Sequence, residues 1–375
     1  LSSSSAASDV YKRQVKSNTA TVTVDKAPGG VTITGDPSKE YNGQPAKLTA
    51  GSYTVTDDGT VTVQYKVKGA DDSTYTETAP TNAGDYTVKV TKAAGTNYDE
   101  ASATKDFTIS RKPVTVSGIT ANGKTYDGNT DAALVYSGVT LAGKVDSDDL
   151  SVTATGTFED KNVGPDKTVN ITDLTLGGAS AGNYILAAEG QQSTTTATIS
   201  PRPVTVTIDA KSSAYGAAIV ELTAKDNGIV DGDNDVYTLA TSATSSSPVG
   251  TYDITGTSNS TNYALTFTGG TKAYTITAAS QSATVTMEGW TYGDTPNEPV
   301  VTGDAEDGAV TYRYKVKDGG YLTEKPTDAG RYTVEATIAA TTNYQETVVP
   351  ADFTIAKKEL TVTGLTATDL SLIHI

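Results

Sequence analysis

Four short sequence landmarks recur in a fixed order along this chain of 375 residues, and this internal repeat constrains the fold more than any other feature. Each unit has a Tyr-Gly-type turn, then a Gly before a strand, then an Asn-Tyr pair, and finally a closing strand. The turn recurs after 85, 89 and 77 residues (41 to 126, 126 to 215 and 215 to 292). Units of this length are small domains, since the turns of a solenoid repeat about every 20–45 residues.

The copies of each landmark share their residue types. The turns lie at Tyr41, Tyr126, Tyr215 and Tyr292; the glycines are Gly84, Gly164, Gly250 and Gly330; the Asn-Tyr pairs begin at Asn97, Asn183, Asn262 and Asn343; and the closing strands are 107–109, 197–199, 274–276 and 353–355. Segments between them, such as Thr60–Val67 and Val204–Ile208, alternate with the period of two that is typical of half-buried strands. We therefore predict an all-β chain of small β-sandwich modules in an extended array.

The two ends of the chain resemble a translated sequencing adapter. Residues 9–14 read DVYKRQ and residues 370–375 read LSLIHI, and codons for one hexapeptide encode the other when they are read on the opposite strand. Both resemble the transposon mosaic end that is used to prepare sequencing libraries. We exclude both hexapeptides from fold reasoning and expect neither to join a core. The only histidine, His374, is excluded with them.

Charge and composition exclude several classes of protein. The chain has 44 Asp and Glu against 28 Lys and Arg, a net charge of −16, which argues against a nucleic-acid partner because phosphate binding needs clustered cations. The absence of Cys excludes disulfides and Cys-based metal sites. No apolar run reaches about 18 residues, so we expect no membrane span in this fragment.

Catalytic residue patterns are missing from the sequence. Without the adapter there is no His or Cys, so no Ser-His-Asp triad, no Cys-His pair and no His-based zinc site can form. The Gly-Gly pairs are turns without the Lys-Ser/Thr of a phosphate loop. Carboxylate pairs alone would allow a glycosidase, but modules this small leave little room for a deep cleft. We expect neither catalytic residues nor a cofactor.

One acidic cluster resembles the start of a calcium loop. Asp231, Asp233 and Asp235 have the D-x-D-x-D spacing, but Val236 and Ser242 replace the Gly and the Glu that such a loop needs at its sixth and twelfth positions. The three aspartates are therefore weak calcium candidates. The competing interpretation is a solvated β-turn.

The 21 tyrosines allow a binding function as well as a structural one. Exposed Tyr rings can stack on sugars, although the recurring positions of most of these residues favour packing inside the modules. Tyr312, Tyr314 and Tyr321, which surround the turn at 317–320, are the best candidates for an exposed ligand patch.

Two segments resemble the D-x-G-x-Y-x-C signature of immunoglobulin domains. They are Asp328–Val334 and Asn82–Val88, and each has a Val in place of the Cys. The resemblance implies Ig-like sandwiches in which Tyr86 and Tyr332 are buried corner tyrosines, with hydroxyls bonded to nearby backbone. Tyr252, which follows Gly250 in the same way, should do the same.

The chain as a whole resembles the tandem YDG-type and MBG-type repeats of large bacterial surface proteins. Lys124–Asn129, Lys161–Gly164 and Gly182–Tyr184 carry the YDG resemblance, and Ala214–Gly216 with Gly228–Asp233 carries the MBG resemblance. We expect Ig-like or MBG-type modules at 27–112 and 280–358, a YDG-type module at 113–202 and an MBG-type module at 203–279. Residues 1–26 would then add the end of a preceding module to the adapter, and 359–375 the start of a next YDG-type module.

The resemblance implies display outside the cell, on a surface-attached or secreted protein, and it supplies no catalytic residues. Two function classes stay open. The chain is either the stalk or spacer of an adhesin, with the neighbouring modules as its partners, or it binds a glycan or a host surface protein directly. An accessory region of a secreted polysaccharide hydrolase is a more distant alternative.

Overall fold

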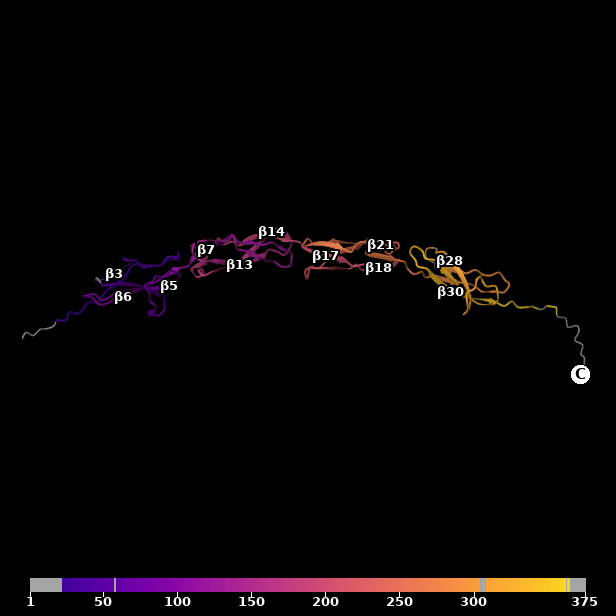
Figure 1. The fold of residues 1–375 in the computed structure, drawn as a ribbon, viewed down its shortest axis with the longest axis horizontal. Helices are drawn as coiled ribbons and strands as arrows, with labels where there is room; N and C mark the ends of the chain where they lie inside the picture. The colour runs from indigo at the N-terminus through magenta and orange to yellow at the C-terminus, as the bar shows by residue number, and fades with distance from the viewer. Residues whose placement is uncertain (1–21, 57–58, 304–305, 307, 362, 365–375) are drawn as a thin grey trace, which may run out of the picture. The chain divides into compact units, whose positions relative to one another are not determined.

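The computed structural model describes residues 22–56, 59–303, 306, 308–361 and 363–364 (Figure 1). Both adapter hexapeptides, and with them His374, lie outside the described residues. The described part contains strands β1 to β30, two short 3-10 helices and no α-helix. This confirms the prediction of an all-β chain, and the strands form several small sheets.

The chain forms two compact units. The first takes in the described residues up to Lys124 together with Thr130–Asp160 and Pro165–Thr198, and the second contains Thr125–Asn129, Lys161–Gly164 and the described residues from Ile199 onward. Strand pairing gives a finer division, because every sheet of the described chain stays within one of four strand groups: β1–β6, β7–β16, β17–β24 and β25–β30.

The first strand group has a four-stranded sheet in the order β2-β6-β5-β4 and a pair of strands, β1 and β3. Its elements are β1 (Val31–Ile33), β2 (Lys39–Glu40), β3 (Tyr53–Val55), β4 (Val61–Val67), η1 (Asp72–Thr74), β5 (Gly84–Lys92) and β6 (Ala101–Ser110). Because side chains alternate along a strand, Val88 and Val90 of β5 point to the same side as Phe107 and Ile109 of β6, and all four are buried.

The second strand group has sheets in the orders β10-β13-β14-β16-β9 and β12-β7-β15, with β8 and β11 paired separately. Its elements are β7 (Lys112–Ser117), β8 (Thr120–Ala121), β9 (Lys124–Thr125), β10 (Asp131–Ala132), β11 (Leu134–Val135), β12 (Thr140–Ala142), β13 (Ser151–Phe158), β14 (Gly164–Gly177), η2 (Ala181–Asn183), β15 (Tyr184–Leu186) and β16 (Thr194–Ser200). Val116, Ile119, Val152 and Ile171 form its core.

The third strand group has two three-stranded sheets, β19-β17-β23 and β18-β24-β21, and the pair β20-β22. Its strands are β17 (Arg202–Ile208), β18 (Lys211–Ala214), β19 (Ala224–Asp226), β20 (Tyr237–Thr241), β21 (Gly250–Tyr252), β22 (Ile254–Ser258), β23 (Tyr263–Thr268) and β24 (Tyr274–Thr277). Its core centres on Ile208, Ile254, Tyr274 and Ile276.

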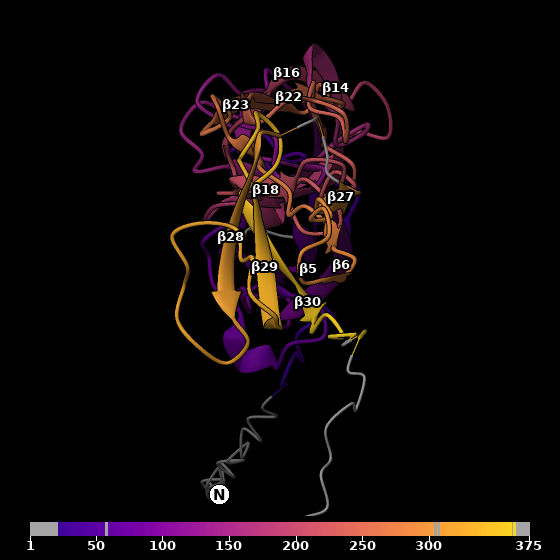
Figure 2. The same ribbon diagram turned by 90° about the vertical axis from the view of Figure 1, so that its right-hand side faces the viewer.

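The fourth strand group repeats the topology of the first, with the sheet β26-β30-β29-β28 and the pair β25-β27. Its strands are β25 (Thr284–Thr286), β26 (Trp290–Thr291), β27 (Val300–Thr302), β28 (Val310–Val316), β29 (Gly330–Ile338) and β30 (Thr347–Ala356). Figure 2 shows β28, β29 and β30 side by side, as their antiparallel pairing requires. Trp290 and Phe353 stack in its core, with ring centroids 5.4 Å apart.

Two of the landmarks lie beside different parts of each strand group, one beside its first residues and the other beside the end of its closing strand. The Tyr of the Asn-Tyr pair lies beside the start of its own group, as Tyr184 pairs with Lys112 and Tyr263 with Arg202. The Tyr of the opening turn instead lies beside the end of the closing strand. The amides of these tyrosines donate to carbonyls at the same distance of 2.9 Å, in the pairs Tyr41 and Ser110, Tyr126 and Ser200, Tyr215 and Thr277, and Tyr292 and Ala356.

Candidate functional site at the contacts between strand groups

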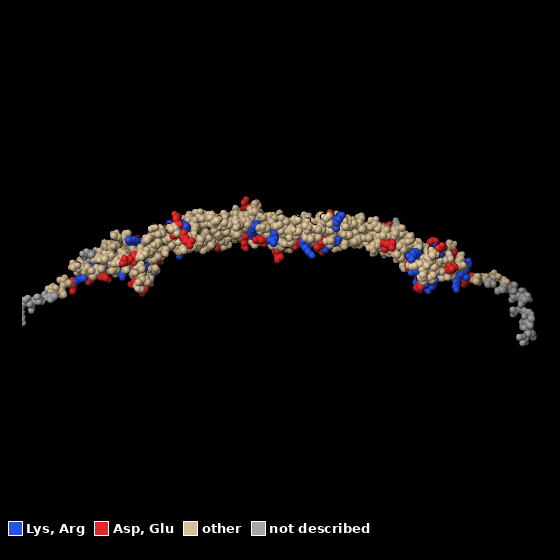
Figure 3. All heavy atoms as spheres, in the orientation of Figure 1, with Lys and Arg blue, Asp and Glu red and all other residues tan. Residues whose placement is uncertain are grey.

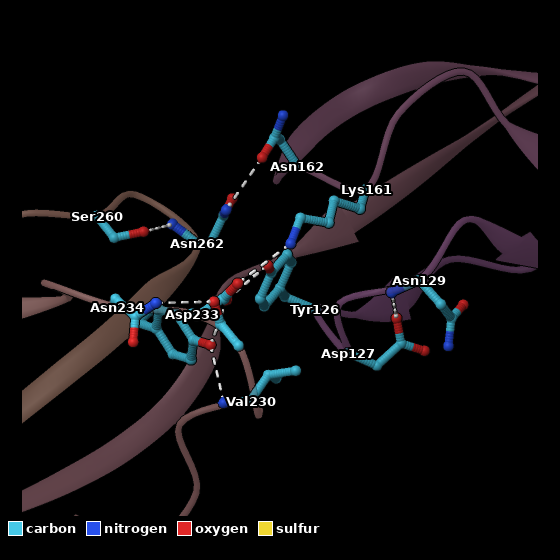
Figure 4. Close-up of polar contacts among 12 residues, drawn as sticks. Tyr126, Asp127, Asn129, Lys161, Asn162, Val230, Asp233, Asn234, Ser260 and Asn262 are labelled. Carbon is cyan, nitrogen blue, oxygen red and sulfur yellow. Dashed lines mark hydrogen bonds and ion pairs between the residues drawn. The ribbon is translucent and has the colours of Figure 1, made fainter.

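A carboxylate joins two tyrosines where the second strand group meets the third, within the second unit (Figure 4). The hydroxyls of Tyr126 and Tyr263 both donate to Oδ2 of Asp233, each at 2.7 Å. The two rings lie edge to face, with centroids 5.4 Å apart, which is a favourable aromatic geometry. Lys161 forms an ion pair with Oδ1 of Asp233 at 3.1 Å, so both carboxylate oxygens are bound.

The same arrangement recurs where the first strand group meets the second, within the first unit. Oδ2 of Asp148 accepts from the hydroxyl of Tyr41 at 2.8 Å and from that of Tyr184 at 2.5 Å. The rings of the two tyrosines are again 5.4 Å apart and edge to face. We call each set, Tyr41-Asp148-Tyr184 and Tyr126-Asp233-Tyr263, a Tyr-Asp-Tyr cluster.

In each cluster, one tyrosine hydroxyl also accepts a hydrogen bond from a backbone amide. The amide of Val145 donates to the hydroxyl of Tyr184 at 2.9 Å, and the amide of Val230 donates to that of Tyr263 at 3.0 Å. A phenol can donate one hydrogen bond and accept others, so these two hydroxyls use both capacities. The loop that carries the aspartate is thereby fixed at its Val and at its Asp.

The turn glycines allow the close approach of these loops. Gly43 has φ +75° and Gly128 has φ +81°, in the left-handed region that favours glycine. A Cβ on Gly128 would lie 2.7 Å from Cγ1 of Val230, and a Cβ on Gly43 would lie 3.2 Å from Cγ1 of Val145. The opening turn of one group therefore lies directly against the aspartate loop of the next.

A second contact recurs at all three meetings of successive strand groups. A backbone amide just before the landmark glycine donates to the side-chain carbonyl of the Asn in the next group's Asn-Tyr pair. The donors and acceptors are Ala83 and Asn183 (2.8 Å), Val163 and Asn262 (3.0 Å), and Val249 and Asn343 (3.0 Å). The landmark glycine and the Asn-Tyr pair thus belong to one repeated interface.

The contact between the third and fourth strand groups keeps the edge-to-face tyrosine rings. Tyr215 and Tyr344 lie edge to face with centroids 5.6 Å apart. Glu306 accepts from Thr341 and Asn343 of its own strand group, and no described residue supplies a carboxylate to Tyr215. This contact therefore has fewer charge-assisted hydrogen bonds between described residues than the other two.

The clusters shift the pKa values of Asp233 and of the four tyrosines. The hydroxyls of Tyr126 and Tyr263 stabilise the carboxylate and hold the pKa of Asp233 below its ordinary value. Burial, and then the hydrogen bond to the aspartate, raise the pKa of Tyr263 and that of Tyr184 to about 12. At neutral pH the Tyr126-Asp233-Tyr263 cluster is one anion bound by two neutral phenols. Such a cluster can hold two surfaces together, and it contains no activated nucleophile.

Three of the four strand groups match known domains. Residues 29–121 match the MBG domain, residues 110–197 the YDG domain and residues 204–273 the MBG domain of YGX type. The chain carries MBG and YDG domains in tandem. No match is found among curated proteins. The aspartate of the first Tyr-Asp-Tyr cluster thus belongs to the YDG domain, and that of the second to the MBG domain of YGX type.

The chain is also similar to solved structures of tandem domains. The match to Drosophila N-cadherin EC1-4 covers 86% of this chain and 99% of the other, at 9% identity and a TM-score of 0.21. The match to Sidekick-1 immunoglobulin domains 1–5 covers 88% and 80%, at 10% identity and a TM-score of 0.20. The match to three N-terminal domains of the bacteriophage RB49 outer capsid protein Hoc covers 89% and 96%, at 12% identity and a TM-score of 0.19.

The weak calcium candidates lie in the aspartate loop of the MBG domain of YGX type. Asp231 and Asp235 are exposed, whereas Asp233 is directed to the two tyrosines and Lys161. Among the described residues, no group of three or more His, Cys, Asp or Glu side chains is placed to hold a metal ion. The loop geometry assigns Asp233 to the domain contact.

The three tyrosines of the expected ligand patch do not share one exposed face. Tyr314 is buried in the core of the fourth strand group, where its ring meets Phe353 edge to face. Tyr321 is exposed, and its ring centroid lies 3.8 Å from Cζ of Arg313. Arg313 precedes Tyr314 in β28, so its side chain points to the opposite face of that strand. Tyr312 is exposed, at 38%. The prediction of one patch that includes Tyr314 is wrong, because this ring completes the core.

The expected corner tyrosines lie where each landmark glycine precedes a strand. Their hydroxyls donate to the backbone carbonyl four residues earlier, in the pairs Tyr86 and Asn82 (2.9 Å), Tyr252 and Pro248 (2.7 Å), and Tyr332 and Asp328 (3.0 Å). Tyr332 is buried and stacks on Phe353, with centroids 5.7 Å apart. Tyr86 and Tyr252 are half-buried.

Sequence reasoning missed the roles of Asp148 and Asp233, although a signal was present. Both follow a Val by three residues in the same V-D-x-D pattern, at 145–148 and at 230–233. The pattern looks like a solvated acidic turn, and only its recurrence at the same place in two domains distinguishes it.

In the described part of the chain, no helix is long and apolar enough to cross a membrane.

Proposed function

We propose that this chain is a spacer region of a secreted bacterial cell-surface protein, and that it holds the binding tip of an adhesin away from the cell. MBG and YDG domains in tandem are typical of bacterial surface proteins. On the face drawn in Figure 3, acidic and basic side chains of the described residues lie in scattered groups on a mostly uncharged surface.

The observation that carries this proposal is the recurrence of the Tyr-Asp-Tyr cluster. A flexible string of domains would need no specific bond between neighbours. Here Tyr41 and Tyr126 are buried against the next domain, and each donates to a charged acceptor there. Hydrogen bonds to charged groups contribute about 1.5–3 kcal/mol each, enough to keep a domain contact closed most of the time. Closed contacts restrict bending, which is what a spacer requires.

Small-angle scattering on the full chain tests the proposal. The double variant Asp148→Ala/Asp233→Ala removes both carboxylates, and we expect it to give a broader distribution of pair distances with a smaller mean extension. The matched control is Asp146→Ala/Asp231→Ala, which removes exposed aspartates of the same two loops. Scattering of the double variant that equals that of the parent and the control would contradict the spacer function.

Direct binding is a second candidate function, favoured by the surface around Tyr321. The exposed ring lies under Arg313, and its hydroxyl donates to Glu335 at 2.7 Å, beside Lys315. An aromatic ring with flanking charges is a common surface for sugars or protein partners. Glycan-array binding by the parent chain that Tyr321→Ala abolishes would support this function, and the absence of binding to any glycan would argue against it for sugars.

A further inference from the structure

The end of the fourth strand group carries one half of a domain contact. Tyr292 donates its amide to the closing strand at 2.9 Å, as Tyr41 does, and Gly293 has φ +86°, close to the φ of Gly43. The exposures differ sharply, however. Tyr292 is 49% exposed, whereas Tyr41 is 4% and Tyr126 is 0% exposed. The ring therefore has the position of a contact tyrosine without the covering partner.

At the end of the fourth strand group, the backbone amide that corresponds to the donors of the repeated Asn contact also lacks an acceptor among the described residues. Ala329 precedes the landmark glycine, in the position that Ala83, Val163 and Val249 have in the other strand groups. Those three amides each donate to an Asn side chain, whereas the Ala329 amide has no hydrogen-bond partner among the described residues. Tyr292 and Ala329 line the same groove, of about 560 Å³, with Lys357–Thr361.

The residues that follow the fourth strand group indicate which type of domain fits the groove. Residues 358–367 read KELTVTGLTA, and residues 112–121 at the start of the YDG domain read KPVTVSGITA. Leu360 is 94% exposed, whereas Val114 at the matching position is 0% exposed. Gly364 has φ +105° and Gly118 has φ +81°, so both matching glycines are left-handed. These similarities favour a YDG-type occupant.

We propose that the groove beside Tyr292 binds the first end of a further YDG-type domain, through an Asn-Tyr pair and an aspartate loop. The Tyr292 hydroxyl would donate to the aspartate, and the Ala329 amide would donate to the Asn side-chain carbonyl. Asp328 replaces Asn82, whose side-chain carbonyl accepts from the amide nitrogen of Asn183 at 3.2 Å. A carboxylate accepts that hydrogen bond at least as well. The inference rests on the proposed spacer function, because it extends the same contact by one domain.

Nitration of tyrosines, located by mass spectrometry, tests this partner. The full chain through Lys358 is extended by a second copy of residues 113–202, and the extra unfolding heat in calorimetry shows that the added domain is folded. We expect nitration of Tyr292 to fall about tenfold relative to the parent chain, toward the level of Tyr41, because the closed contact buries the ring. Nitration of the exposed Tyr312 should stay unchanged.

Substitution by Ala of the added aspartate that corresponds to Asp148 should restore the nitration of Tyr292, and the same change at the position of Asp146 should not. Unchanged nitration of Tyr292 beside a protected Tyr41 would overturn this inference alone. Ready nitration of Tyr41 as well would overturn the inference and the spacer function together. Protection of Tyr292 in the unextended chain that rises with protein concentration would overturn it in favour of a second copy.

Discussion

The hydroxyl of Tyr126 donates a 2.7 Å hydrogen bond to Asp233, a residue 107 positions further along the chain. The same separation of 107 residues joins Tyr41 to Asp148. The bond therefore links the opening turn of one domain to the aspartate loop of the next, in two successive pairs of domains. The landmark turns therefore do more than shape single domains, because in the structure they also form contacts between neighbouring domains.

Loss of the shared carboxylate should weaken this contact. Asp233→Ala leaves the hydroxyls of Tyr126 and Tyr263 without their acceptor, and we expect the free energy of unfolding of the MBG domain of YGX type to fall by about 1.5–3 kcal/mol. Calorimetry of the full chain measures this change. Asp231→Ala, two residues away and exposed, should stay within about 0.5 kcal/mol of the parent. Equal effects of the two variants would refute the role of Asp233.

Acid should open the same contact. The pKa of Asp233 is lower in the folded chain than its ordinary value of 3.8, so below about pH 4 the unfolded chain binds more protons than the folded chain. The stabilisation is complete above the unfolded pKa and is lost as the pH falls through the folded pKa. Unfolding midpoints of the parent should therefore decrease more steeply below pH 4 than those of Asp233→Asn. Parallel pH profiles would contradict this assignment.

Substitution of two turn glycines tests whether the opening turn of one domain contacts the aspartate loop of the next. Gly128 and Gly216 have φ of +81° and +80°, so either change to Ala costs about 1–2 kcal/mol in backbone strain. Only at Gly128 would the new Cβ meet a neighbour, Val230, at 2.7 Å; at Gly216 nothing lies within 4 Å. We expect Gly128→Ala to cost about 1–3 kcal/mol more than Gly216→Ala in denaturant unfolding. Equal costs would show that the two loops are not in contact in solution.

The corner tyrosine of the fourth strand group should stabilise its own core. Tyr332→Ala removes a buried ring from Phe353 and should cost about 3–5 kcal/mol, whereas Tyr332→Phe loses one hydrogen bond and should cost about 1 kcal/mol. Calorimetry should show the transition of this strand group alone moving, with Tyr312→Ala as the exposed control. A small effect of Tyr332→Ala would mean that the ring is accessible to ligands.

Sequence patterns predicted the parts of this fold that depend on local chemistry. The alternation in β5 and β29, and the glycine that lies two residues before Tyr86 and Tyr332, indicate strands and corners because each signal lies within a few residues. Tyr314 was misplaced for a related reason. The side-chain period of two shows which residues share a face of a strand, and it does not show which face is buried.

The contacts between domains could not be predicted from one copy of any landmark. Tyr126, Asp233 and Asn262 each look like an ordinary turn or strand-start residue, and their pairing joins segments about 100 residues apart. The long-range signal exists only as recurrence: the same Tyr and Asp are separated by 107 residues twice. A single domain would therefore reveal the sandwich without revealing how it is joined to its neighbour.

A double-mutant cycle between Tyr126 and Asp233 tests the central claim most directly. Tyr126→Phe, Asp233→Ala and the double variant are compared in the full chain through the calorimetric free energy of unfolding of the MBG domain of YGX type. Because the two side chains share one hydrogen bond across the domain contact, we predict a coupling energy of about 1–3 kcal/mol. Additive effects within about 0.5 kcal/mol would contradict the account, since they would mean that the contact is not formed in solution.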